Sequence, residues 1–241
     1  MDFVKTAVVT GATSGLGKEI AIYLLTADWK VYLLGRSVED LKEEEPFTEY
    51  FKNRQAVGCK SDFLNDSETL KAVSRIMKAE KSLGLLIHSA AYYTAGNVSE
   101  GDLSDLDKSY QINVKAPFML TQKLVPSLSK GKGAVIFLNS SSINGRVNEN
   151  LVAYTATKSA LKSMADSLRK EVNTKGIRVT TVYLGKTDTP MQKKASNLFD
   201  YDYKADRMMN PTSVAKIICD TALSPREIEC TDLYLRPSMP Y

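Results

Sequence analysis

Short apolar runs alternate along the chain with longer segments in which apolar residues recur every three or four positions. The short runs are rich in β-branched residues, which predicts buried strands, and the longer recurrence predicts amphipathic helices. The predicted strands cover residues 5–10, 31–34, 56–59, 85–87, 134–138, 178–184 and 233–236. The predicted helices cover residues 16–27, 67–80, 106–120 and 153–173, with a short exposed helix in the acid-rich segment 39–45.

This alternation of strands and helices is typical of a parallel sheet whose strands are joined by crossover helices. We therefore predict an α/β fold with a doubly wound parallel sheet of about seven strands. No internal repeat, low-complexity segment or linker interrupts the pattern, so residues 1–241 are predicted to form one domain. Residues 187–210 are polar, weakly periodic and contain Pro190, which predicts a mobile loop over the substrate.

The composition is that of an ordinary globular protein, with 43% hydrophobic and 25% charged residues. The net charge of +4 is not gathered into a basic stripe, which argues against a nucleic-acid partner. The chain has no apolar run of roughly 18 residues and no N-terminal signal-peptide pattern, so we expect no membrane association and a cytoplasmic location. One histidine and three widely spaced cysteines predict neither a metal site nor a disulfide framework.

Glycines cluster where the first predicted strand passes into the first predicted helix, in the sequence Thr10-Gly-Ala-Thr-Ser-Gly-Leu-Gly17. Because glycine has no Cβ, the backbone can turn tightly and approach a pyrophosphate, while the helix N-terminus offers free N–H groups to it. The turn therefore predicts a Rossmann-type dinucleotide site. Its predicted cofactor-binding residues are Gly11, Thr13, Ser14, Gly15, Leu16 and Gly17.

The end of the second predicted strand bears on the choice between NADP(H) and NAD(H). A carboxylate there would bind the ribose 2′-hydroxyl of NAD, whereas an arginine accommodates the 2′-phosphate of NADP. The sequence has Arg36 and Ser37 at this point and no acidic residue before Glu39. Arg36 can pair with the phosphate and stack on adenine, and Ser37 can donate a hydrogen bond. We therefore expect NADP(H) to be favoured over NAD(H).

Tyr154 and Lys158 open a predicted helix, and their spacing of four places the phenol and the ammonium on one helix face. Together with the other motifs, this pair makes the chain resemble the short-chain dehydrogenase/reductase (SDR) family over nearly all of its length. The T-G-x-x-x-G-x-G turn of the family is similar to residues 10–17, and its Y-x-x-x-K pair to Tyr154 and Lys158. The asparagine of its active site corresponds to Asn113 in Gln-Ile-Asn-Val, and its serine-bearing strand end to residues 139–142.

The resemblance implies hydride transfer between a nicotinamide and a small carbonyl or alcohol substrate. Tyr154 is then the general acid in reduction and the general base in oxidation. A free tyrosine has a pKa near 10. A nearby ammonium and the positive charge of the oxidised nicotinamide are expected to lower it. The resemblance also gives Lys158 the role of holding the ribose hydroxyls, and Asn113 that of holding a helix kink and a water chain from Lys158 to solvent.

A serine hydroxyl is expected to orient and polarise the carbonyl, but three neighbouring serines compete for this role. The spacing of the family from both its tyrosine and its asparagine selects Ser141. Continuing the apolar strand favours Ser140, and the pattern Ser-Ser-x-x-Gly that ends at Gly145 favours Ser142. We take Ser141 as the prediction and keep the other two open.

The remaining site residues rest on the resemblance alone. After the fourth strand, His88-Ser-Ala-Ala replaces the Asn-Asn-Ala-Gly of the family, and His88 is expected to be a hydrogen-bonded strand-end residue without a catalytic role. After the sixth strand, Leu184-Gly185 replaces Pro-Gly. The Thr187 backbone is implied to contact the nicotinamide carboxamide, and the Thr189 hydroxyl the carboxamide or a phosphate. The residues implied to flank the adenosine are Asp62, Phe63, Ser89, Ala90 and Ala91.

The resemblance also implies a homodimer or homotetramer, paired through the helix at 153–173 and the long helix before it. One alternative comes from another class of function, namely a non-catalytic NADP(H)-binding sensor or scaffold of the same fold. Family members without catalysis tend to lose the tyrosine or the lysine, and both are present here. The sequence therefore favours the enzyme.

Overall fold

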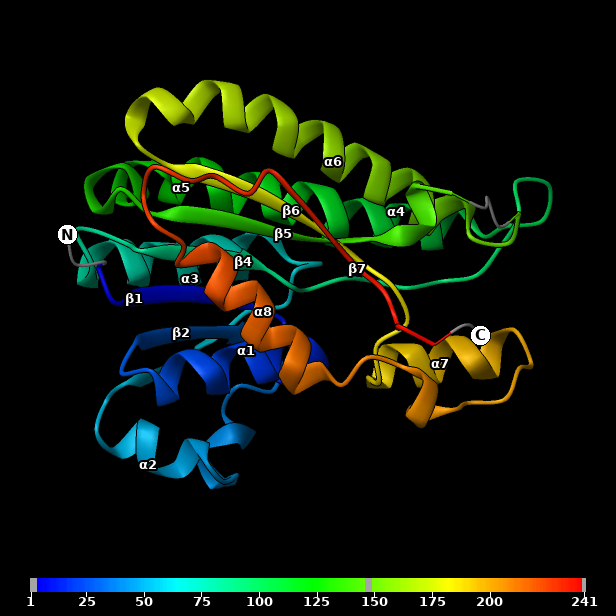
Figure 1. The fold of residues 1–241 in the computed structure, drawn as a ribbon, viewed down its shortest axis with the longest axis horizontal. Helices are drawn as coiled ribbons and strands as arrows, with labels where there is room; N and C mark the ends of the chain where they lie inside the picture. The colour runs from blue at the N-terminus through cyan, green and yellow to red at the C-terminus, as the bar shows by residue number, and fades with distance from the viewer. Residues whose placement is uncertain (1–3, 146–148, 240–241) are drawn as a thin grey trace.

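The computed structural model describes residues 4–145 and 149–239, and within them seven parallel strands form one sheet in the order β3-β2-β1-β4-β5-β6-β7 (Figure 1). The strands are β1 (Thr6–Thr10), β2 (Lys30–Gly35), β3 (Ala56–Lys60), β4 (Leu85–His88), β5 (Ala134–Ser140), β6 (Arg178–Leu184) and β7 (Asp232–Leu235). The α-helices are α1 (Gly15–Thr26), α2 (Phe47–Lys52), α3 (Asp66–Ala79), α4 (Leu103–Tyr110), α5 (Ala116–Gly131), α6 (Val152–Val172), α7 (Pro190–Leu198) and α8 (Pro211–Ala222). The predicted single-domain, doubly wound sheet is confirmed.

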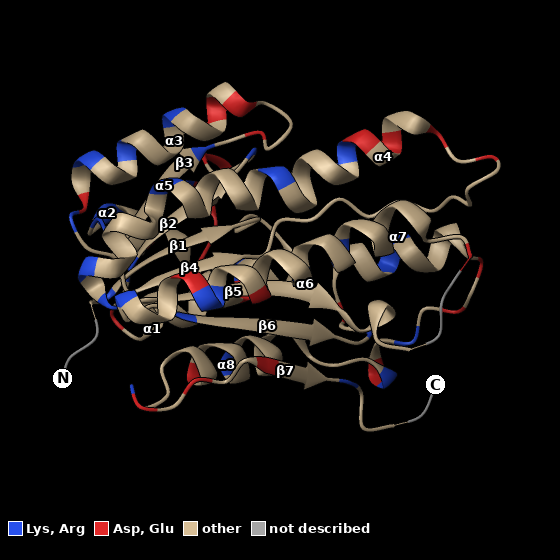
Figure 2. Ribbon diagram, turned by 90° about the horizontal axis from the view of Figure 1, so that it is seen from above, with Lys and Arg blue, Asp and Glu red and all other residues tan. Residues whose placement is uncertain are grey.

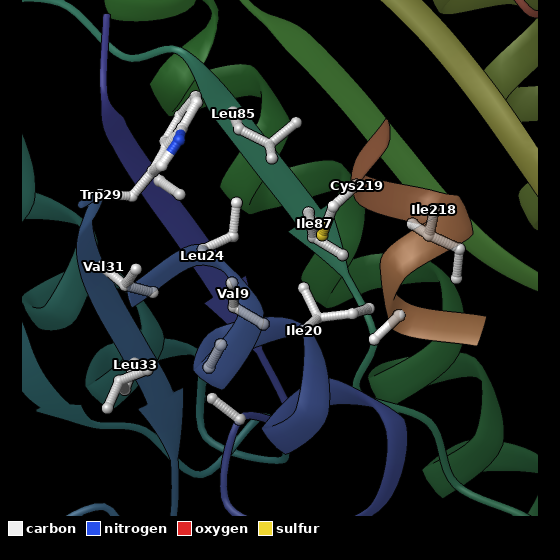
Figure 3. Close-up of a cluster of buried hydrophobic side chains, with 14 of the residues drawn as sticks. Val9, Ile20, Leu24, Trp29, Val31, Leu33, Leu85, Ile87, Ile218 and Cys219 are labelled. Carbon is white, nitrogen blue, oxygen red and sulfur yellow. The ribbon is translucent and has the colours of Figure 1, made fainter. Parts of the chain in front are cut away.

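Helices cover both faces of this sheet, and each face has its own core. Successive strand residues point to opposite faces, so Val8 of β1 packs in one core and Val9 in the other. On the Val9 face, the sheet packs against α1, α2 and α8, and Figure 3 shows Ile20 of α1 and Ile218 of α8 among the side chains of this core. The opposite face is covered by α3, α5 and α6. Because the central strands are buried on both sides, they are continuous apolar runs in the sequence.

The segment 187–210, predicted as a mobile loop, instead contains the helix α7, which lies beyond the carboxyl end of the sheet (Figure 1). Pro190 is the first residue of α7, where the missing N–H of proline is no loss. The Thr189 hydroxyl accepts the Gln192 N–H at 3.3 Å and caps the helix. The same arrangement starts α8, where the Asn210 side chain caps a helix that begins with Pro211. Proline marks these two helix starts.

The helix predicted at 106–120 is interrupted in the structure. It consists of α4, a π-helical segment Gln111–Lys115, and α5, which continues to Gly131. A π-helical turn contains one residue more than an α-helical turn, and such turns occur frequently at functional sites.

Candidate active site

The order of strands in the sheet reverses direction between β1 and β4, and in open α/β sheets such a reversal leaves a crevice at the carboxyl ends of the two strands. Ligands of open α/β sheets bind at this switch point. The buried Thr10 connects the two strand ends, because its hydroxyl accepts the backbone N–H of Ser89 at 3.0 Å and of Ala90 at 3.1 Å. Ala91 follows them along the same half-buried segment. The sequence motif contains Thr10, but its role in joining β1 to β4 appears only in three dimensions.

The glycine turn between β1 and α1 has the shape of a phosphate cradle. Gly11 has φ of +65°, and a Cβ there would lie 2.9 Å from the backbone of Ala90. A Cβ on Gly17 would lie 2.4 Å from the carbonyl oxygen of Gly11. The N-cap residue Ser14 makes no side-chain capping hydrogen bond, and the first turn of α1 contains no acidic residue. The first N–H groups of α1 are therefore open to an anion, which fits the phosphates of a dinucleotide.

The two strands beyond β1 bring the predicted adenosine contacts to one corner of the crevice. The Ser61 N–H donates to the Gly35 carbonyl at 3.0 Å, which joins the end of β3 to the end of β2. Arg36 and Ser37 are exposed directly after β2. The predicted residues at this corner are Arg36, Ser37, Asp62 and Phe63.

Tyr154 and Lys158 lie on the first two turns of α6, and both are buried, with exposed fractions of 7% and 3%. The Lys158 ammonium donates to the Leu138 carbonyl at 2.8 Å and lies 5.7 Å from the centroid of the Tyr154 ring. Burial lowers the pKa of Lys158 to about 8. Burial also raises the pKa of Tyr154 to about 12, against a smaller lowering by a hydrogen bond with Ser140. Burial therefore dominates the pKa of Tyr154, and the lowering of this pKa that was expected from the Lys158 ammonium is not found.

Ser140, and not Ser141, is the serine that contacts the Tyr154 hydroxyl. As the last residue of β5, Ser140 continues the strand toward the crevice, and its hydroxyl also bonds the Ser142 hydroxyl at 2.8 Å. Ser141 is exposed to solvent. The geometry therefore favours Ser140 over Ser141, the residue predicted from the family spacing, as the serine beside Tyr154. The number of residues between two motifs does not determine which side chain at the end of a strand faces the site.

Asn113 lies inside the π-helical segment and is 1% exposed. Its side-chain oxygen accepts the Tyr92 N–H at 2.7 Å. Its amide group donates to the Tyr92 carbonyl and to the Thr157 hydroxyl, both at 3.0 Å. Asn113 thus connects the segment after β4 to the helix that carries Tyr154 and Lys158. These three hydrogen bonds satisfy its side-chain amide, so the residue can be buried at little cost.

A second buried asparagine, Asn139, was not predicted as a functional residue. Its amide group donates to the Lys158 carbonyl at 3.0 Å, and its side-chain oxygen accepts the Ser140 N–H at 2.8 Å. Asn139 therefore holds the serine-bearing end of β5 against α6. Its only signal in the sequence is a polar residue that ends an apolar strand.

Thr187 and Thr189 follow the end of β6 and lie at the same edge of the sheet. Thr187 is buried and its hydroxyl donates to the Gly185 carbonyl at 3.1 Å. Thr189 lies against the glycine turn, since a Cβ on Gly15 would be 3.5 Å from the Thr189 Cβ. The structure therefore brings the glycine turn and both threonines to one edge of the sheet.

Residues 4–145 and 149–239 contain no group of three or more His, Cys, Asp or Glu side chains that could hold a metal ion. In the same residues, no helix is both long enough and apolar enough to cross a bilayer.

Comparison with known proteins adds three findings. The family described as short chain dehydrogenase matches residues 5–198. An uncharacterized oxidoreductase of Staphylococcus saprophyticus is 30% identical over 237 residues, which are 97% of each chain. Among solved structures, an alcohol dehydrogenase from Thermococcus sibiricus, complexed with 5-hydroxy-NADP, has a TM-score of 0.85 at 17% identity over 98% of both chains.

A second solved structure is similar but holds the other cofactor. The 3-ketoacyl-(acyl-carrier-protein) reductase from Brucella melitensis, complexed with NADH, has a TM-score of 0.81 at 20% identity. It covers 95% of this chain and 96% of its own. Likeness at this level establishes the fold, and the two complexes leave the choice between NADP(H) and NAD(H) to the residues of this chain.

Proposed function

This chain belongs to the short-chain dehydrogenase/reductase family and is an NAD(P)-dependent oxidoreductase, and from that premise we propose that it interconverts a carbonyl and an alcohol with NADP(H). The observation that carries the proposal is the meeting of Tyr154, Lys158 and Ser140 at the carboxyl edge of the sheet. When bound, the nicotinamide supplies or accepts the hydride.

Tyr154 is the group that exchanges the proton with the substrate oxygen. With a pKa of about 12, its phenol is protonated at neutral pH and ready to donate to a carbonyl oxygen during reduction. Ser140 shares a hydrogen bond with this phenol, so its hydroxyl can orient and polarise the same carbonyl. In oxidation Tyr154 must first lose its proton, and positive charge near the phenol favours that loss.

Lys158 supplies part of this charge and binds the cofactor. One N–H of its ammonium is used by the Leu138 carbonyl, which fixes the side chain and leaves two donors for ribose hydroxyls. Asn113 and Asn139 support this arrangement by fixing α6 against its neighbours. The hypothesis of a water chain from Lys158 toward Asn113 remains part of the proposal.

Arg36 supports the choice of NADP(H). It follows β2, where the ribose phosphate of NADP would lie, and it is exposed beside Ser37. A guanidinium can bind a phosphate with two parallel hydrogen bonds. We also propose assembly as a homodimer or homotetramer through α6 and the helices α4 and α5, by analogy with the family.

The test is NADPH oxidation, followed at 340 nm near neutral pH with ketones, aldehydes and quinones, and repeated with NADH. We expect turnover with NADPH and slower turnover with NADH. The variant Tyr154→Phe lacks only the phenolic hydroxyl, so it should lose turnover and keep its affinity for NADPH.

Retained turnover in Tyr154→Phe would remove the assigned acid/base role. Faster turnover with NADH would overturn the argument from Arg36 and leave the chemistry standing. NADPH binding without any turnover would instead favour the sensor.

A further inference from the structure

Tyr93, in the segment after β4, packs directly against the reacting tyrosine. The Tyr93 and Tyr154 rings meet edge to face, with centroids 4.8 Å apart and an interplanar angle of 63°. Tyr93 is half-buried, so part of its side chain is accessible. The other two groups placed beside Tyr154 are polar, namely the Ser140 hydroxyl and the Lys158 ammonium. Tyr93 therefore adds an aromatic surface to a site whose other contacts with Tyr154 are polar.

The residues on both sides of Tyr93 in the chain are held by hydrogen bonds. The Asn113 side chain accepts the Tyr92 N–H at 2.7 Å and donates to the Tyr92 carbonyl at 3.0 Å. The Thr94 hydroxyl donates to the Asp105 carboxylate on α4 at 2.6 Å. Tyr93 thus stands between two residues that are fixed to the π-helical segment and to α4.

A lysine of α7 holds the backbone of Tyr93 itself. The Lys194 ammonium donates to the Tyr93 carbonyl at 3.1 Å and is attracted by the charge of Asp105. Figure 2 shows α4 and α7 at the carboxyl end of the sheet, with acidic residues on α4 and basic residues on α7. Because three elements fix this segment, the Tyr93 ring needs little further ordering when a ligand binds against it.

The ring of Tyr93 is uncharged at the pH of the proposed reaction. Burial raises the pKa of Tyr93, and the Tyr154 and Tyr201 phenols raise it further. A neutral aromatic ring attracts a second ring at centroid separations of about 4.5–7 Å, beyond what the burial of the same area contributes. The accessible part of Tyr93 is therefore suited to another aromatic ring.

The proposed reaction restricts where the substrate lies. Its oxygen must come within hydrogen-bond reach of the Tyr154 hydroxyl, about 3 Å, and the carbonyl carbon lies one bond further. A group attached to that carbon then lies next to the phenol that Tyr93 also contacts.

We propose that Tyr93 determines substrate specificity, and that the substrate carries an aromatic ring on its reacting carbon, as in an aryl ketone, an aryl aldehyde or the corresponding alcohol. The ring packs against Tyr93 while the oxygen meets Tyr154 and Ser140. The proposal names the substrate class of the oxidoreductase proposed above and rests on that function. Tyr93 contacts the substrate and takes no part in the transfer of the proton.

The experiment compares two ketones that differ only in the aromaticity of one ring. Acetophenone and cyclohexyl methyl ketone are titrated by calorimetry into protein saturated with NADP⁺, which has no hydride to transfer, so binding is measured without turnover. The aromatic preference is the dissociation constant of cyclohexyl methyl ketone divided by that of acetophenone. We expect a preference of about threefold to tenfold in the wild type, the range that aromatic pairs contribute.

Three variants assign this preference to the ring of Tyr93. Tyr93→Leu keeps an apolar side chain without a ring and should lower the preference to about one, whereas Tyr93→Phe keeps the ring and should retain the preference. The matched control is Tyr110→Leu, the same exchange at a tyrosine of α4 that is 49% exposed. It should leave the binding of both ketones unchanged.

The proposal is overturned if the wild type binds neither ketone or binds both equally, a comparison that needs no variant. It is also overturned if Tyr93→Leu weakens both ketones by the same factor, because Tyr93 would then only support the position of Tyr154. NADPH oxidation with the two ketones is read separately. Its absence beside a clear aromatic preference in binding would count against the proposed reaction and not against the role of Tyr93.

Discussion

Ser140 stands where β5 becomes a turn, and this position decides which of three consecutive serines faces the crevice. Its hydroxyl bonds both the Tyr154 phenol and the Ser142 hydroxyl, whereas Ser141 points to solvent. The sequence contains the three serines and the family spacing, but it does not contain the direction of each side chain. A hydroxyl is useful to catalysis only where it reaches the reacting oxygen.

At this scale we predict a clear difference between two neighbouring alanine variants. Ser140→Ala should lower kcat about 100-fold or more, the loss typical of a donor that stabilises the developing oxyanion. Ser141→Ala removes a hydroxyl that faces solvent and should stay within about twofold of the wild type. Steady-state rates of the two variants with one carbonyl substrate decide the matter; a larger loss in Ser141→Ala would restore the choice made from family spacing.

Among the secondary-structure elements, those with a strong apolar pattern were predicted and those defined by their caps were not. The strands and the helices α1, α3 and α6 have residues that pack on the sheet at regular spacing, so their existence follows from the sequence. The short α2 has one fully buried residue, Phe47, and gives almost no periodic signal. The helices α7 and α8 begin with Pro190 and Pro211 directly after a capping side chain, a start signal that the pattern of apolar residues does not contain.

The start of α1 offers a test of the glycine turn as an element. A Cβ on Gly17 would lie 2.4 Å from the Gly11 carbonyl oxygen, so Gly17→Ala must displace backbone. We expect it to lower the free energy of unfolding by about 1–3 kcal/mol, as overpacked positions do, and to weaken NADPH binding. Urea unfolding and a cofactor titration measure the two effects.

Gly145→Ala is the matched control, because a Cβ there would meet no atom of the described residues within 4 Å. It should leave both the unfolding transition and the NADPH affinity unchanged. Equal effects of the two substitutions would mean that close backbone approach is not what requires glycine at position 17.

Across the whole molecule, stability and chemistry occupy different parts of the same sheet. The two cores lie between the sheet and its helices, whereas the reacting groups gather at one edge of it. The fold class, the glycine turn and the Tyr154–Lys158 pair were predicted because each is encoded in a local pattern. The contact between the Tyr93 and Tyr154 rings was not, because it joins segments that lie far apart in the chain and have no shared pattern.

The single histidine makes the pH dependence of global stability easy to assign. His88 is buried, its Nε2 bonds the Thr121 hydroxyl at 2.8 Å, and its ring stacks on Phe137. Burial, with a smaller contribution from the Lys158 charge, lowers the pKa of His88 to about 3. In the unfolded chain this pKa is near 6.5, so below pH 6.5 the unfolded state binds the extra proton and the free energy of unfolding falls.

We expect this one group to lower the free energy of unfolding by about 2 kcal/mol between pH 7 and pH 5. The measurement is urea unfolding at several pH values for the wild type and for His88→Asn, whose amide does not titrate in this range. The difference between the two curves isolates the histidine from the carboxylates. Curves that run parallel from pH 7 to pH 5 would show that His88 takes up its proton in the folded state.

The π-helical segment Gln111–Lys115 sets how α5 is rotated about the helix axis relative to α4. Each residue of an α-helix turns the chain by about 100°, so one additional residue rotates α5 by that angle relative to α4. This rotation lets α4 pack on α6 while α5, in the same rod, packs on α3. Deleting one residue would leave the apolar stripe of α5 intact but turn it away from the sheet, and would move Asn113 off Thr157. The length of this segment is therefore constrained more tightly than the identity of most of its residues.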